Sequence, residues 1–244
     1  MTLSVQLYSA REAFTADPSD TLRRIAELGY TRVEPYGLIT HAPVLREALP
    51  AHGLTAPTAH QTFLGDDVAP VLAAAREAGV GTVIDPHVPQ ERWQHADDVA
   101  ATAALINDAA RVAADHGVRI GYHNHAHELA STIGGTTALE YFADRLDDAV
   151  VLEVDTYWAA VGGTDPVALL RRLGERVVAV HVKDGPATPE TLDQVAVGQG
   201  SLPIPDILAA APQALRVVEL DATRGDMFTA LADSYSYLTG QVPA

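Results

Sequence analysis

The sequence predicts an α/β protein built as a single (β/α)8 barrel, and three observations support this fold class. Eight short runs of apolar and β-branched residues alternate with eight longer stretches at helical spacing. Several of the short runs are apolar on both faces, as strands of a parallel sheet under a helical layer must be. The 244 residues also match the roughly 250 of one such barrel. We therefore expect one domain over residues 1–244, with an open doubly wound sheet as the alternative.

The expected elements follow one another in regular alternation along the chain. The strands are expected at 3–8, 31–34, 55–59, 82–85, 119–124, 150–155, 177–182 and 216–220. The helices are expected at 19–28, 42–52, 68–78, 97–116, 136–145, 166–173, 204–211 and 227–238. Four of the helical stretches are followed by a glycine, where a left-handed helix cap is sterically cheap: Gly29, Gly53, Gly79 and Gly117. Pro18 and Pro166 stand near two helix starts, as is typical of first-turn prolines.

Composition excludes several classes of function. Sixteen basic residues against 32 acidic ones give a net charge of -16, which repels nucleic acid and anionic membrane surfaces. The chain has no cysteine, so a metal would have to use His, Asp or Glu. The N-terminal residues lack the basic and apolar regions of a leader, and no run of eighteen apolar residues occurs. We expect a cytoplasmic protein that binds neither nucleic acid nor membrane.

The carboxyl ends of the expected strands are unusually polar. In a barrel of this type these ends surround the mouth at which chemistry takes place. Seven of them carry a carboxylate, an imidazole or both: Glu34, His60, Asp85 with His87, GYHNHAHEL from 121, LEVDTYW from 152, HVKD from 181 and VVELD from 217. One such residue alone would be an ordinary solvated charge. Together they favour a divalent ion held by nitrogen and oxygen ligands.

Strand periodicity groups these residues further. Side chains two apart share a face, which pairs His123 with His125, Glu153 with Asp155, and His181 with Lys183. Asp155 could instead cap a following helix. We favour a ligand role because Thr-Tyr-Trp is a poor first helical turn. Glu219 lies in an apolar strand, so a partner cation is expected, since an unpaired buried carboxylate is costly.

Lys183 is the only lysine beside fifteen arginines. An ammonium group, unlike a guanidinium, can lose its proton, so a site that needs a proton donor or a carbonyl partner could require lysine here.

The motifs GYHNHAHEL, LEVDTYWAAVGGTDP, RVVAVHVKDG, VGQGSLPIPDIL and VVELD, in this order, resemble the xylose isomerase-like TIM barrels known as sugar phosphate isomerases/epimerases. The resemblance covers nearly the whole chain. It implies one divalent ion, manganese, cobalt, magnesium or zinc, and it matches Asp155, His181 and Glu219 to three of the ligands. The fourth ligand is either His123 or Glu128, and we slightly favour Glu128.

The implied activity is proton abstraction beside a sugar carbonyl through an enediolate, leading to isomerisation or epimerisation. Glu219 and His123 would then be the acid/base pair, with His125 as the other candidate imidazole, and Lys183 would donate to a substrate oxygen. The expected substrate contacts are Glu34, His60, His87, His125 and Trp158.

Three alternatives remain open beside this reading. The same residues suit a dehydratase or lyase acting on a keto-sugar or keto-cyclitol, as in inosose dehydratases. A metal-free barrel that only binds a sugar would keep the carboxylates without the ion. The related zinc endonucleases for abasic DNA are disfavoured by the net charge of -16. The expected partner is therefore a small sugar or cyclitol, and the many small residues on helices such as 97–116 would allow a homodimer.

Overall fold

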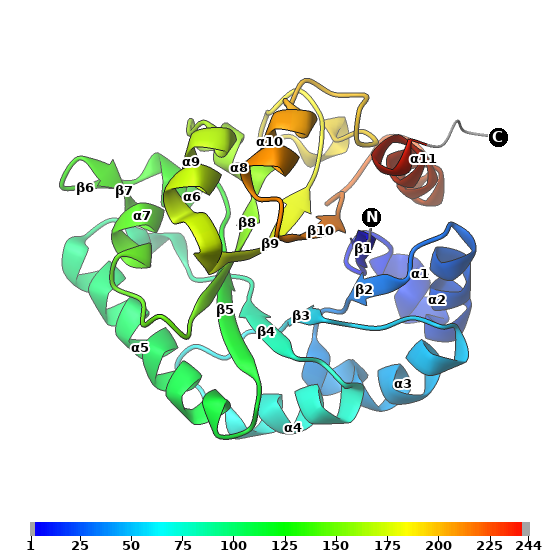
Figure 1. Ribbon diagram of the computed structural model, residues 1–244, viewed down its shortest axis with the longest axis horizontal. Helices are drawn as coiled ribbons and strands as arrows, with labels where there is room; N and C mark the ends of the chain where they lie inside the picture. The colour runs from blue at the N-terminus through cyan, green and yellow to red at the C-terminus, as the bar shows by residue number, and fades with distance from the viewer. Residues whose placement is uncertain (1–2, 241–244) are drawn as a thin grey trace.

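The computed structural model describes residues 3–240 and confirms a barrel of parallel strands surrounded by helices (Figure 1). Positions 1–2 and 241–244 of the expected 1–244 domain lie outside the described residues. The barrel strands are β1 (Leu3–Gln6), β2 (Arg32–Glu34), β3 (Thr58–His60), β4 (Thr82–Asp85), β5 (Arg119–His123), β8 (Val151–Asp155), β9 (Val177–Val182) and β10 (Leu215–Val218). They are hydrogen-bonded in the order β2-β1-β10-β9-β8-β5-β4-β3.

The two end strands of this order also meet, and their meeting closes the barrel. His60 N donates to the carbonyl of Pro35 at 2.7 Å, and Val33 N donates to the carbonyl of Thr55 at 2.9 Å. Because every neighbouring pair is parallel, all carboxyl ends face the same side. The polar strand ends therefore form one ring, as the sequence predicted.

Helices cover the outside of this ring. They are α1 (Arg11–Ala16), α2 (Pro18–Glu27), α3 (Leu38–Ala51), α4 (Ala69–Ala78), α5 (Ala96–Ala114), α6 (His127–Ala130), α7 (Ala138–Ala143), α8 (Thr156–Val161), α9 (Pro166–Leu173), α10 (Ile204–Ala210) and α11 (Met227–Thr239), with single 3-10 turns at Gln90–Trp93, Gly174–Arg176 and Thr191–Asp193. The glycines expected to cap helices, Gly29, Gly53, Gly79 and Gly117, all have positive φ. Among the described helices, none combines the length and the apolar character that crossing a membrane requires.

The region expected as one helix over 136–145 differs from the prediction. It begins with a hairpin of β6 (Thr132–Ile133) and β7 (Thr136–Thr137). Gly134 and Gly135, both with positive φ, make its turn, because glycine adopts that backbone without steric cost. Helix α7 starts only at Ala138, where Thr137 and Glu140 form a capping box.

The barrel interior changes from apolar to polar within two residues along β5 and β8. Ile84, Gly121 and Val151 stand side by side on β4, β5 and β8. A Cβ at Gly121 would lie 2.7 Å from Ile84 Cδ1, so this position has room for glycine only. Two residues further along, His123 and Glu153 face each other across the same strand pair. The small apolar floor thus supports a buried polar layer directly above it.

Candidate active site

A cleft with a volume of about 380 Å³ opens at the carboxyl ends of the strands. Six of the predicted site residues line it: His60, His87, His123, His125, Lys183 and Glu219. Tyr8 and Tyr36 form an aromatic part of its wall, with ring centroids 5.5 Å apart in an edge-to-face arrangement. Lone tyrosines after strands carry no spacing signal, so this wall could not be predicted from the sequence.

Two predicted substrate contacts, Glu34 and Trp158, lie outside the described cleft lining. Glu34 is fully buried beneath the cleft, where its Oε1 accepts a hydrogen bond from Gln6 Nε2 at 2.8 Å. Trp158 is half-buried on α8, and its ring centroid lies 5.7 Å from Lys183 Nζ. Glu34 therefore accepts its hydrogen bond below the cleft, and Trp158 packs beside Lys183.

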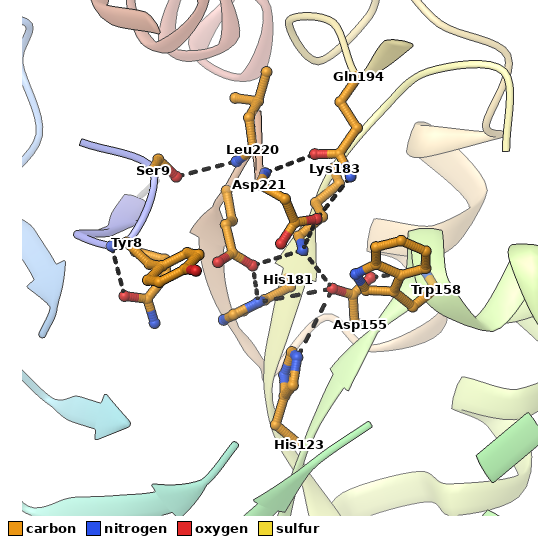
Figure 2. Close-up of polar contacts among 12 residues, drawn as sticks. Tyr8, Ser9, His123, Asp155, Trp158, His181, Lys183, Gln194, Leu220 and Asp221 are labelled. Carbon is orange, nitrogen blue, oxygen red and sulfur yellow. Dashed lines mark hydrogen bonds and ion pairs between the residues drawn. The ribbon is translucent and has the colours of Figure 1, made fainter. Parts of the chain in front are cut away.

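An acidic cluster around Lys183 forms one side of the site (Figure 2). The ammonium Nζ lies 2.9 Å from Asp155 Oδ2, 2.8 Å from Glu219 Oε2 and 2.9 Å from Asp221 Oδ2. His181 adds its Nδ1 at 2.6 Å from Glu219 Oε2 and 3.9 Å from Asp155 Oδ2. The partner cation that the sequence led us to expect for Glu219 is thus the single lysine of the chain.

Burial and these charges set the protonation states of the cluster. Burial alone would lower the pKa of Lys183, but the carboxylates of Asp155, Glu219 and Asp221 outweigh it and hold that pKa well above its ordinary value. Burial would raise the pKa of Glu219, but Lys183 and His181 hold it well below its ordinary range. Burial raises the pKa of Asp155 to about 6, with Lys183 and His181 opposing it. Lys183 and Glu219 are therefore an ion pair at neutral pH.

Asp155 is both a helix cap and a member of this cluster. Its Oδ1 accepts a hydrogen bond from Trp158 N at 2.8 Å at the start of α8. The expectation that Thr-Tyr-Trp would not form a first helical turn is wrong, because the aspartate supplies the acceptor that the free N–H groups need. The second oxygen, Oδ2, lies 2.9 Å from Lys183 Nζ and faces the cluster. The cap holds the carboxylate in one orientation, with Oδ2 directed into the site.

The arrangement fits a divalent cation. Oδ2 of Asp155 and Nδ1 of His181 are buried and converge on the same cluster, 3.9 Å from each other, with Nδ1 2.6 Å from Glu219 Oε2. Ligand atoms of Asp155, His181 and Glu219 all lie within 4.8 Å of one another. Two carboxylate oxygens and one imidazole nitrogen are a donor set that borderline and hard divalent ions accept. Asp155, His181 and Glu219 were the three ligands matched by resemblance.

The structure does not bring Glu128 to these three residues. Its carboxylate accepts hydrogen bonds from Tyr122 Oη at 2.6 Å and from His125 N at 2.9 Å, at the turn after β5. Burial raises its pKa to about 7. Within residues 3–240, neither group of candidate ligands includes Glu128. The other candidate for the fourth position, His123, lies closer, with Nε2 at 3.9 Å from Asp155 Oδ2.

A second polar cluster lies one layer deeper, and Glu153 is its centre. Glu153 Oε2 is 2.5 Å from His60 Nε2, 3.1 Å from His181 Nε2 and 3.3 Å from His123 Nδ1. All four residues are buried. The sequence analysis assigned Glu153 no role, although it shares a strand face with Asp155. That face-sharing within an apolar strand was the signal that could have identified it.

Two imidazoles on the cleft wall, those of His123 and His125, are neutral. Burial lowers the pKa of His123 to about 3 and the pKa of His125 to about 2, and neighbouring positive groups act in the same direction. A neutral imidazole keeps one nitrogen free to accept a proton. The ring of His87 lies 5.5 Å from that of His125, edge to face. The cleft therefore combines proton-accepting rings with a charged acid and lysine cluster.

Comparison with known proteins agrees with this geometry. A family model described as the xylose isomerase-like TIM barrel matches residues 22–214. The chain belongs to this family. Family members with many reactions share its barrel, so the family establishes the architecture and the place of the site rather than the reaction.

Individual proteins also resemble this chain in sequence or in structure. An inosose dehydratase of Klebsiella pneumoniae (strain 342) is 29% identical over 147 residues, which are 56% of this chain and 46% of the relative. The chain thus spans less than half the length of that curated relative. The structure of a sugar phosphate isomerase/epimerase from Parabacteroides distasonis ATCC 8503 superposes with a TM-score of 0.84 at 23% identity, over 97% of this chain and 93% of that one. The IOLI protein, solved with a zinc atom, superposes with a TM-score of 0.77 at 14% identity, over 98% and 97% of the two chains.

Proposed function

We propose that this protein is a metal-dependent isomerase or epimerase that removes a proton from the carbon beside the carbonyl of a sugar or cyclitol. One observation supports the proposal above all others. The buried set of Asp155, His181, Glu219 and Lys183 stands beside a cleft that is also lined by the neutral imidazoles of His123 and His125. Asp155, His181 and Glu219 would hold the ion, which when bound supplies Lewis-acid polarisation of the substrate carbonyl.

Proton transfer belongs to residues on the cleft wall. His123 is neutral and can accept a proton, and its Nδ1 lies 3.3 Å from the carboxylate of Glu153. A carboxylate at that distance stabilises an imidazolium as it forms. Glu219 is ionised and lines the same cleft, so it is the second candidate acid/base group. Two such groups in one cleft suit removal of a proton on one side of a substrate and its return elsewhere.

Lys183 and Asp221 complete the proposed chemistry. Lys183 Nζ already lies within 2.9 Å of three carboxylates, so donation to a substrate oxygen requires one of them to move. Asp221 is the partner with the most solvent exposure, at 22% of its side chain, and it lines the cleft. We infer that Asp221 gives way when a substrate oxygen takes its place on the ammonium.

The substrate we propose is uncharged. Of the described residues that line the cleft, Lys183 is the one with a lysine or arginine cation, and three carboxylates already match it. Phosphate sites in proteins normally offer an arginine fork or free backbone N–H groups. A keto-sugar or keto-cyclitol without phosphate therefore suits this wall better than a sugar phosphate.

Dehydration is the second candidate outcome, and the relationship to an inosose dehydratase favours it. Elimination begins with the same proton abstraction, and a hydroxyl group on the next carbon then leaves with a proton from the enzyme. The two outcomes differ in their products, an isomeric sugar in one case and an unsaturated ketone plus water in the other.

Solvent exchange tests the shared first step. Manganese-loaded protein is incubated with unphosphorylated ketoses and inososes in heavy water, and proton NMR follows deuterium uptake and new products. We expect uptake by the wild type, a loss of at least about 100-fold in Glu219→Gln, as for removal of a general acid or base, and no change in Glu47→Gln, whose side chain is 78% exposed. Exchange in Glu219→Gln at the wild-type rate, or none by the wild type with any of these ketones, contradicts the proposal.

A further inference from the structure

The cluster beneath the cleft has the composition and spacing of a metal site of its own. His60, His123, Glu153 and His181 each offer one ligand atom, and these atoms all lie within 4.8 Å of one another. The residues come from four different strands, β3, β5, β8 and β9, so the barrel backbone rather than a loop holds them. Both His60 and His123 also line the cleft, which gives an ion a way in.

Two of the three distances from Glu153 Oε2 to imidazole nitrogens are close to those around a small tetrahedral ion. Bonds of about 2.0–2.1 Å in a tetrahedron place neighbouring donor atoms about 3.3–3.4 Å apart. Glu153 Oε2 is 3.3 Å from His123 Nδ1 and 3.1 Å from His181 Nε2. His60 Nε2 is closer, at 2.5 Å from the same oxygen, so this one ring would have to withdraw slightly.

Hydrogen bonds leave the cluster incompletely satisfied. Three imidazole nitrogens converge on one oxygen of Glu153, yet Nδ1 of His123 and the other Glu153 oxygen, Oε1, have no hydrogen-bond partner. Both side chains are buried, and buried polar atoms without partners are rare. An ion held by Glu153 and the imidazoles would give such buried atoms the partner that they lack.

Charge balance also favours an ion in this cluster. Glu34 and Glu153 are both buried in this layer, and Glu34 Oε1 lies 2.8 Å from His181 Nε2. If the imidazoles are neutral, these two carboxylates leave a buried charge of about -2, which needs a counter-charge. A divalent ion supplies it in full. Imidazolium forms of His60 and His181 would supply the same positive charge without a metal. Zinc titration distinguishes the two cases.

The geometry points to a second, nitrogen-rich metal site formed by His60, His123, Glu153 and Nε2 of His181, distinct from the site of Asp155, His181 and Glu219. With this ion bound, His123 is a ligand and its other nitrogen carries a proton, so His125 and Glu219 are then the acid/base pair. Three imidazoles and one carboxylate select zinc-type ions over magnesium or manganese. The two sites share His181, which offers Nε2 to one and Nδ1 to the other. If ions fill both at once, this ring gives up both of its N–H protons.

Metal binding to single variants tests the site. Metal-free protein is titrated with zinc in competition with a chromophoric chelator, and with cobalt, whose visible absorption reports four-coordinate ligands. The variants are Glu153→Gln and His60→Asn for the deeper site and Asp155→Asn for the upper one. His116→Asn, at an exposed histidine, is the matched control. Circular dichroism and thermal midpoints establish that each variant is folded, and His60→Asn serves if Glu153→Gln is not.

We expect Glu153→Gln and His60→Asn to weaken zinc binding by more than the roughly 10–100-fold that loss of an outer partner causes. Asp155→Asn should lose the ion of the upper site and keep zinc binding and the four-coordinate cobalt spectrum of the deeper site. Wild-type affinity in a folded Glu153→Gln or His60→Asn overturns the inference, as does loss of all zinc in Asp155→Asn alone or no zinc binding by the wild type. Deuterium exchange is measured separately, so failure of this site and failure of the proposed reaction are distinguishable.

Discussion

Replacing Lys183 with methionine should destabilise the protein strongly, because it removes the ammonium that lies within 2.9 Å of three carboxylates. Asp155 and Glu219 have side-chain exposures of 0% and 6%, whereas Asp221 is 22% exposed and can turn to water. Methionine fills similar space, so the loss is mainly electrostatic. Removing one partner of a buried ion pair costs about 3–5 kcal/mol, since the remaining charge stays desolvated.

The expected shift in melting temperature follows from the size of the chain. Proteins of 150–250 residues shift by roughly 2–4 °C per kcal/mol, so Lys183→Met should melt about 6–20 °C below the wild type at pH 7. The difference should shrink as the pH falls toward 5. In the wild type Lys183 helps to hold the pKa of Glu219 well below its ordinary range. Without the ammonium Glu219 can take up a proton in the folded variant at higher pH, and this stabilises the variant more than the wild type.

Differential scanning calorimetry of metal-free protein between pH 5 and pH 8 measures both effects. Arg23→Met is the control, because its ion pairs with Asp20 and Glu27 are on the surface, and it should shift the midpoint far less. The double variant Lys183→Met/Asp155→Asn should recover part of the loss. A midpoint within about 2 °C of the wild type at pH 7, or a deficit that does not change with pH, would refute the role of Lys183 as the counter-charge.

Three further predictions concern packing, protonation and ligand choice. In Gly162→Ala the new Cβ would lie 2.6 Å from the carbonyl oxygen of Ala126, so we expect a loss of about 1–3 kcal/mol in urea denaturation, whereas Gly81→Ala, with 3.9 Å to its nearest contact, should be neutral. Burial raises the pKa of Glu128 to about 7, above about 4.3 in the unfolded chain, so the native state binds this proton more tightly and stability should fall as pH rises through that window. Glu128→Gln should flatten this slope, and an unchanged pH profile would contradict it. Phosphorylated ketoses should bind the cleft more than about tenfold more weakly than the parent sugars, because like charges placed together cost several kcal/mol. Competitive inhibition measures this difference. Equal inhibition constants would contradict a preference for uncharged substrates.

Much of the architecture follows from local sequence signals. The apolar runs and the glycines after helices define the alternation of strands and helices, because strand periodicity and left-handed caps depend on neighbouring residues only. The polar strand ends then have to meet, since parallel strands direct all carboxyl ends to one side. Asp155, His181 and Glu219 could be predicted as one group on that basis and by family resemblance.

Other features depend on the register and closure of the barrel. Glu153 meets His60, which is 93 positions away, and Lys183 meets Asp221, 38 positions away. Glu128 is engaged by Tyr122 and the backbone of His125, so its charge is used locally at the turn after β5. No pattern along the chain encodes these contacts. The register between neighbouring strands decides which inward-facing residues share a layer. That register is set only when the strands pair and the sheet closes. The sequence by itself therefore determined the barrel and the ring of polar ends, and the tertiary structure decided which of those side chains face one another.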